Sequence, residues 1–162
     1  MDIIEKALGS QLGEMVATLC VSMLPILELR GGIPFGVSIG LSPWMAMIAS
    51  IIGNMLPVPF IIAFIRLIFA WLRKKSGWLE RMVTKLENRA EGKWEIVQKY
   101  ELIGLMIFVA IPLPGTGAWT GALIAAMLDM RMKHALPAIF LGVLIAGFLI
   151  TGLTFGFTVI FS

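Results

Sequence analysis

The chain has 162 residues, of which 59% are hydrophobic and only 14% are charged. Soluble domains carry about 25% charged residues, so this composition excludes an ordinary soluble domain and predicts an integral membrane protein with a single domain. The net charge of +3 does not indicate nucleic-acid binding, because the basic residues cluster as membrane topology requires. Cys20 is the only cysteine, which excludes an internal disulfide and a thiolate metal site.

Four apolar tracts surround one polar segment, and they cover residues 15–41, 44–72, 102–128 and 135–161. A membrane-spanning helix needs about 20 apolar residues. The second and fourth tracts meet this requirement, and Pro57 and Pro59 predict a kink in the second. The first and third tracts are interrupted by Gly- and Pro-rich motifs. Each is therefore either a spanning helix with a broken centre or a re-entrant hairpin that returns to its own side.

The positions of the basic residues favour the hairpins. One group lies in the segment 73–101, and a second group, Arg131 and Lys133, follows the third tract. Cytoplasmic loops are enriched in Lys and Arg, and both groups are cytoplasmic only if the third tract turns back. By the same logic the N-terminus lies outside. The first group comprises Arg73, Lys74, Lys75, Arg81, Lys85, Arg89, Lys93 and Lys99.

We therefore expect an all-α membrane protein in which each half is a re-entrant helical hairpin followed by a spanning helix. The halves, residues 1–72 and 102–162, form an inverted repeat. The segment 73–101 between them is a cytoplasmic amphipathic helix, which either recruits anionic lipids, gates a pathway or only connects the halves. Small residues at four-residue spacing also indicate a repeat, although Gly-rich membrane segments often show such spacing: Gly32, Gly36 and Gly40, then Gly117, Gly121 and Ala125 at positions 85 residues later.

The first motif, Leu-Glu-Leu-Arg-Gly-Gly-Ile-Pro, places Glu28 and Arg30 deep in an apolar tract. Buried charges in a membrane are costly and point to function. Gly31, Gly32 and Pro34 predict extended backbone, in which positions i and i+2 share a face. Arg30 can then bind a phosphate or carboxylate, and Glu28, shielded from water, can exchange protons near neutral pH. The alternative is a structural ion pair that holds the hairpin tip, or a pair that lies near the surface.

The second motif spans residues 111–121 and carries no charge. A helix that begins after such a loop directs free N–H groups and its positive dipole end into a cavity, which suits an anionic headgroup. Asn54, in the second tract, either bonds across helices or lines the same cavity. No spacing of side chains predicts an enzyme, a cofactor or a metal. The candidate binding residues of this motif are Pro112, Pro114, Gly115, Thr116, Gly117, Trp119 and Thr120.

The motifs at residues 28–34 and 112–121 together resemble those of the small multidrug export membrane family of bacteria and archaea, and the resemblance covers nearly the whole chain. That family looks like a distant relative of the DedA superfamily. The resemblance implies two re-entrant hairpins in the cytoplasmic membrane of a prokaryote. Some DedA relatives are implicated in moving undecaprenyl phosphate or other lipids across bilayers, and in proton-dependent drug tolerance.

Residues and resemblance together predict a transporter of an amphiphilic anion, such as a polyprenyl phosphate lipid, with Glu28 coupling protons and Arg30 binding the anionic group. Export of small drugs is the alternative within transport. A structural or partner-binding membrane protein is the alternative from another class. Membrane lipids are the expected partners. A homodimer is also expected, because one small domain has little surface with which to enclose a pathway.

Overall fold

The computed structural model describes residues 10–75, 77, 81 and 94–161, and within these residues it is helical and contains no strand. This confirms the all-helical prediction. The described helices are α2 (Gln11–Ser22), α3 (Glu28–Ser38), α4 (Pro43–Met55), α5 (Val58–Lys75), α7 (Trp94–Ala110), α8 (Ala118–Met127) and α9 (Met132–Phe161).

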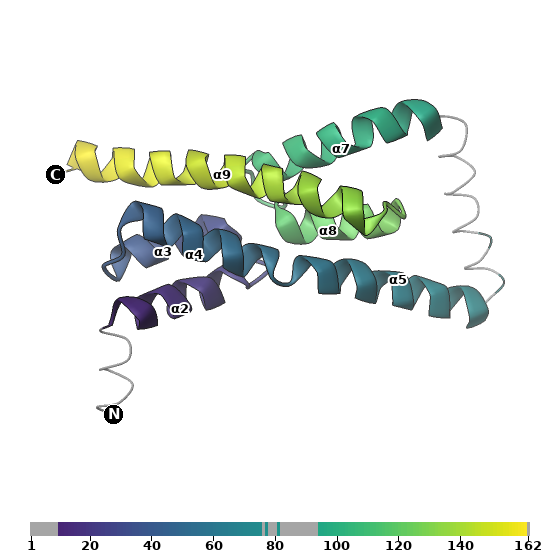
Figure 1. Ribbon diagram of the computed structural model, residues 1–162, viewed down its shortest axis with the longest axis horizontal. Helices are drawn as coiled ribbons and strands as arrows, with labels where there is room; N and C mark the ends of the chain where they lie inside the picture. The colour runs from purple at the N-terminus through teal and green to yellow at the C-terminus, as the bar shows by residue number, and fades with distance from the viewer. Residues whose placement is uncertain (1–9, 76, 78–80, 82–93, 162) are drawn as a thin grey trace.

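Two pairs of short helices turn back on themselves beside two long helical rods. Helices α2 and α3 run antiparallel and pack against α4, whereas α7 and α8 run antiparallel and pack against α9 (Figure 1). The rod formed by α4 and α5 runs opposite to α9, and α8 lies beside α5. The first pair occupies one half of the long axis and the second pair the other half, so their connecting loops lie near the middle.

The long rods are apolar enough to cross a membrane. By length and composition, the candidate spans are Pro43–Ile68 and Met132–Gly156. The first span is interrupted where α4 ends, before Pro57 and Pro59, which agrees with the kink expected from these prolines. These spans coincide with the second and fourth apolar tracts.

The break in the first tract lies earlier than the sequence suggested. Residues 23–27 form the loop, and Gly31, Gly32 and Pro34 lie inside α3. The prediction of extended backbone at these three residues is therefore wrong. Helix propensity is a weak preference that tertiary contacts override, and α3 packs closely against both α2 and α4.

Glycine in α3 serves close helix packing. A Cβ added to Gly32 would overlap Ser22 Oγ, and one added to Gly36 would lie 2.8 Å from Thr18 Oγ1. Both α2 hydroxyls bond within their own helix, since Ser22 Oγ donates to the Thr18 carbonyl at 2.8 Å and Thr18 Oγ1 to the Glu14 carbonyl at 2.7 Å. Small residues spaced by four thus allow the helix backbones to approach closely.

Helices α3 and α8 end with the same pair of backbone hydrogen bonds, the Schellman motif. In each, the residue after the C-cap has a positive φ, +117° at Gly40 and +51° at Asp129. Each motif leads directly into a long apolar helix. The bonds run from Leu41 N–H to Gly36 O and from Gly40 N–H to Val37 O after α3, and from Met130 N–H to Ala125 O and from Asp129 N–H to Ala126 O after α8.

A contact at one end of the molecule joins α5 to the turn before α9. The guanidinium of Arg66 donates to the Met130 carbonyl, and its Nε lies 3.6 Å from Asp129 Oδ1. The basic residues at the end of α5 and those at the start of α9 therefore lie at the same end of the molecule. This is the arrangement that the charge pattern requires if the third tract turns back.

The predicted connector, residues 73–101, is only partly described. Residues 73–75 continue α5 and residues 94–101 belong to α7, so both ends of the predicted connector belong to neighbouring helices. Most of the predicted amphipathic helix lies outside the described residues.

Gly53 provides a test of this packing, because a Cβ there would collide with the backbone carbonyl group of Leu19 in α2. We expect Gly53→Ala to lower stability by about 1–3 kcal/mol, as overpacking against a rigid backbone does. The measurement is the unfolding temperature of the purified protein in detergent. Gly152→Ala is the matched control, since a Cβ at Gly152 in α9 meets no atom within 4 Å. Equal losses in both variants would contradict the packing described.

Candidate functional site

The carboxylate of Glu28 lies at the N-terminus of α8, although the two are distant in sequence. Glu28 Oε1 accepts a hydrogen bond from the Trp119 backbone N–H at 3.1 Å, and the side chain is only 4% exposed. Gly117, the N-cap of α8, has no side chain with which to cap the helix. The first N–H groups of a helix lack partners within the helix, so a residue of α3 caps α8.

The backbone conformations of Glu28 and Gly117 fit this contact. Glu28 has a φ of +47° and Gly117 has a φ of +136°. The left-handed region costs a non-glycine residue about 1–2 kcal/mol, so the contacts of Glu28 offset a local strain. A Cβ at Gly117 would overlap Glu28 Oε2. Glycine at 117 therefore supplies both the conformation and the space for the carboxylate.

Arg30 binds the loop that precedes α8. Its Nη1 donates to the Leu113 carbonyl. Its Nη2 lies 2.5 Å from the Thr116 carbonyl, 2.6 Å from Thr116 Oγ1 and 3.3 Å from the Ile111 carbonyl. A cation is favourable just beyond a helix C-terminus, and this loop directly follows α7. The guanidinium thus satisfies carbonyl oxygens that the break in the third tract leaves without helical partners.

Two further contacts hold the loops in place. Thr116 Oγ1 lies 2.7 Å from both the Ile111 and the Leu113 carbonyl oxygens, so its hydroxyl shapes the second loop from within. The indole Nε1–H of Trp119 donates to the Met23 carbonyl at 3.1 Å, which ties α8 back to the first loop. We call the contacts made by Glu28, Arg30, Thr116, Gly117 and Trp119 the loop clamp.

The structure distributes the other candidate residues around the loop clamp. Pro112, Pro114 and Gly115 belong to the second loop, and Thr120 is half-buried in α8. Gly31, Gly32 and Pro34 lie in α3, and Asn54 is fully buried in α4. Sequence reasoning missed Met23, Ile111 and Leu113. These residues contribute only backbone carbonyls, for which the sequence carries no side-chain signal.

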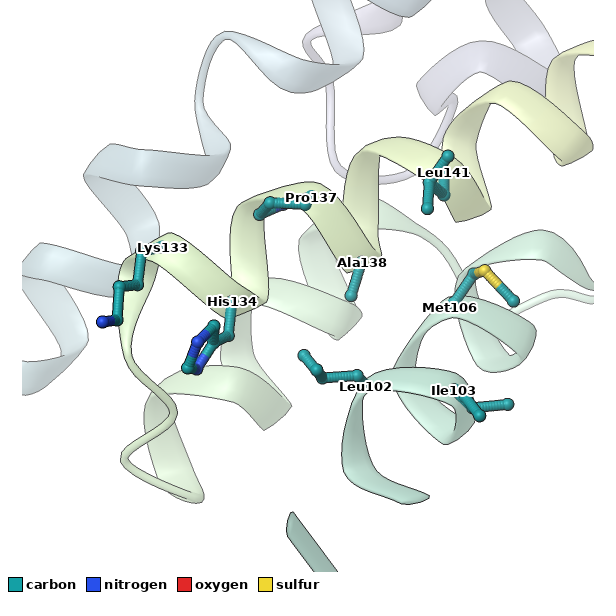
Figure 2. Close-up of a pocket in the computed structure, with 8 residues that line it drawn as sticks. All are labelled: Leu102, Ile103, Met106, Lys133, His134, Pro137, Ala138 and Leu141. Atoms are coloured by element: carbon teal, nitrogen blue, oxygen red, sulfur yellow. The ribbon is translucent and has the colours of Figure 1, made fainter. Parts of the chain in front are cut away.

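A groove lies between α7 and α9 (Figure 2). Its volume is about 380 Å³, and its walls are apolar except for Lys133 and His134 at the start of α9. Both helices run from the basic end of the molecule toward the loop clamp, so the groove leads from two basic residues along an apolar path. The residues that line it are Leu102, Ile103, Met106, Lys133, His134, Pro137, Ala138 and Leu141.

Long apolar helices, shorter apolar helices and broken loops joined by internal hydrogen bonds define an integral membrane protein. The chain belongs to the family described as "Putative small multi-drug export protein", whose model matches residues 28–149. The match begins at Glu28 and includes the motifs at residues 28–34 and 112–121. The description of the family is that of an exporter. Comparisons with curated proteins and with solved structures give no match.

The loop clamp predicts that a lysine cannot replace Arg30. Lysine keeps the charge but lacks the planar fork that reaches several carbonyls at once, so we expect Arg30→Lys to destabilise the protein by about 2 kcal/mol. The measurement is the unfolding temperature in detergent, with Arg131→Lys at an exposed position as the control. An unfolding temperature of Arg30→Lys equal to that of the wild type would mean that the loop contacts contribute little.

Proposed function

We propose that this protein carries an amphiphilic anion, such as a polyprenyl phosphate lipid, across the bilayer. One observation supports this above the others: the carboxylate of Glu28 occupies the N-terminus of α8, and the guanidinium of Arg30 binds the loop directly before that helix. Helix N-termini and arginine side chains are the protein groups best suited to bind phosphate. The loop clamp therefore has the character of an anion site filled by a carboxylate of the protein itself.

The proposed architecture is two re-entrant hairpins in an inverted repeat, as in the DedA superfamily. Helices α2, α3 and α8 have 12, 11 and 10 residues, and the apolar part of the longer α7 is Tyr100–Ala110. At 1.5 Å per residue they are about 15–18 Å long, which is about half of a hydrocarbon core of about 30 Å. Hairpins of this length, with their loops in the middle of the molecule, would end near the bilayer midplane.

The shared helix ends support a repeat, in a register that differs from the one read from glycine spacing. The Schellman motifs pair Gly36 with Ala125, and the same separation pairs Glu28 with Gly117. The glycine pattern would instead pair Gly36 with Gly121. In the register given by the helix ends, the capping carboxylate and the N-cap that it serves occupy corresponding positions in the two halves.

The proposed mechanism is an exchange of anions at α8. A phosphate oxygen can accept the same N–H bond as Glu28 Oε1. The guanidinium of Arg30 can exchange its hydrogen bonds to backbone carbonyls for hydrogen bonds to the phosphate. Protonation of Glu28 removes the competing charge. Proton uptake by Glu28 would therefore be coupled to anion binding.

The α7–α9 groove, which extends from the start of α9 to Met106 and Leu141, would receive such a substrate on its way toward the loop clamp. Lys133 and His134 suit a negatively charged headgroup, and the apolar walls suit a hydrocarbon chain (Figure 2). We place this basic end, with the segment 73–101, on the cytoplasmic side of a prokaryotic cell membrane, because Lys and Arg are enriched there.

A homodimer belongs to this proposal. Ile26 in the first loop is 93% exposed and Leu113 in the second is 56% exposed. Apolar side chains at the proposed midplane depth would face lipid or a second copy of the chain. A second copy would enclose the pathway more completely than one small domain can.

Two other functions remain as alternatives. The family description favours export of small drugs, for which the half-exposed Phe35 and Trp119 would form aromatic walls. The internal hydrogen bonds of Arg30 favour a structural or partner-binding protein in which the loop clamp only holds the hairpins together.

The first test is movement of a labelled polyprenyl phosphate in liposomes, with and without a pH gradient. We expect transport by the wild type to depend on the gradient. Glu28→Gln should lose that dependence, and its rate should fall roughly tenfold or more, because a side chain that cannot ionise cannot displace the bound anion again. Glu14→Gln, at the first turn of α2, is the matched control. Transport of drugs but not lipids would favour the exporter, and inactivity with both would favour the structural protein.

The groove makes a separate prediction. Replacing both Lys133 and His134 with glutamine should reduce the initial rate for the anionic lipid several-fold, because the Lys133 ammonium and the His134 ring N–H draw the headgroup to the groove. A neutral lipid of equal chain length should be unaffected. Lys74→Gln, exposed in α5, is the control for general surface charge. An equal loss with Lys74→Gln would indicate membrane electrostatics rather than a groove.

A further inference from the structure

Helices α3 and α4 pack in a regular antiparallel register. A Cβ added to Gly36 would lie 2.9 Å from Ala46 Cβ, and one added to Gly32 would lie 2.8 Å from Ser50 Oγ. Each step of four residues back along α3 thus matches a step of four forward along α4. Residues four apart share a helix face, so the next pair in this register is Glu28 and Asn54.

This face contains buried polar atoms without partners. Ser50 Oγ and both side-chain polar atoms of Asn54 are buried and have no hydrogen-bond partner among the described residues. The same holds for Glu28 Oε2, which lies against Gly117 at the start of α8. Ser50 and Asn54 are 0% exposed. A buried polar group left unpaired is strongly unfavourable. A cation bound among them would satisfy the three oxygen atoms, Ser50 Oγ, Asn54 Oδ1 and Glu28 Oε2, and would therefore stabilise the fold.

The backbone beside Asn54 also offers oxygen atoms. Pro57 and Pro59 lack the N–H groups that would bond to the carbonyls of Gly53 and Met55 in a continuous helix. Helix α4 ends at Met55, and the C-terminal end of a helix is the negative end of its dipole. Interrupted membrane helices with free carbonyl groups are typical cation sites.

We propose that Glu28, Ser50 and Asn54 form a binding site for a small monovalent cation of the size of Na⁺, between α3 and α4. The site offers oxygen donors, which hard cations prefer. It carries one carboxylate, whose single charge balances one monovalent ion. Oε1 of Glu28 then caps α8, and the unpartnered Oε2, which lies against Gly117, is the carboxylate atom that we assign to the cation. A role for this cation in driving transport rests on the proposed function. The binding of the cation does not.

The test is thermal unfolding of the purified full chain in detergent, with NaCl titrated against N-methylglucamine chloride at constant ionic strength. A ligand that binds only the folded state raises the unfolding temperature with its concentration. We expect such a rise in the wild type, and a half-saturating Na⁺ concentration raised roughly tenfold or more in Ser50→Ala and Asn54→Leu. Thr151→Val is the matched control, because Thr151 is a buried, unpartnered hydroxyl in α9.

Three outcomes would overturn the proposal: no Na⁺ dependence in the wild type, an equal rise with KCl, or the same dependence in the control and the site variants. If the site variants do not fold, the ²³Na resonance decides the question. The wild type should broaden this resonance, and excess Li⁺, but not N-methylglucamine, should reverse the broadening. Neither measurement contains a lipid substrate. A failure of lipid transport therefore leaves the cation site intact, and the absence of Na⁺ binding leaves lipid transport intact.

Discussion

The structure depends on polar groups of one hairpin that satisfy the backbone of the other. A broken helix in an apolar region exposes N–H groups at one end and carbonyl oxygens at the other. Glu28 supplies an acceptor for the start of α8, and Arg30 supplies donors for the carbonyls that follow α7. The two opposite charges of the first motif thus match the two opposite needs of the second. This explains why the second motif contains no charged residue.

Much of the fold could be predicted because composition and charge act over whole segments. The long spans and the two interrupted tracts follow from apolar length, and the turn of the third tract follows from basic residues that Arg66 and Met130 bring to one end. The exact break in the first tract could not be predicted. Local preferences of Gly31, Gly32 and Pro34 indicated extension there, but close packing of α3 against its neighbours keeps them helical.

The candidate site was identified by residue type but not by its partners. Glu28 and Arg30 were singled out because a charge in an apolar tract needs a reason, and that argument needs no fold. Their partners lie more than 80 residues away and are mostly backbone atoms, which the sequence cannot distinguish. The glycines have different roles that their spacing does not distinguish. Gly36 allows close helix packing, whereas Gly40 adopts the positive φ that ends α3. A spacing pattern merges these two roles and therefore cannot by itself define a register between the halves.

A single carboxylate at the junction of α3, α4 and α8 constrains any transport mechanism. If an anionic substrate takes the place of Glu28 at the N-terminus of α8, the displaced carboxylate remains in an apolar region, where an uncompensated charge is costly. A proton or a small cation must then neutralise it. Each substrate molecule bound at α8 would therefore be accompanied by one positive charge at Glu28. Coupling in this arrangement follows from electrostatics and requires no large movement of the hairpins.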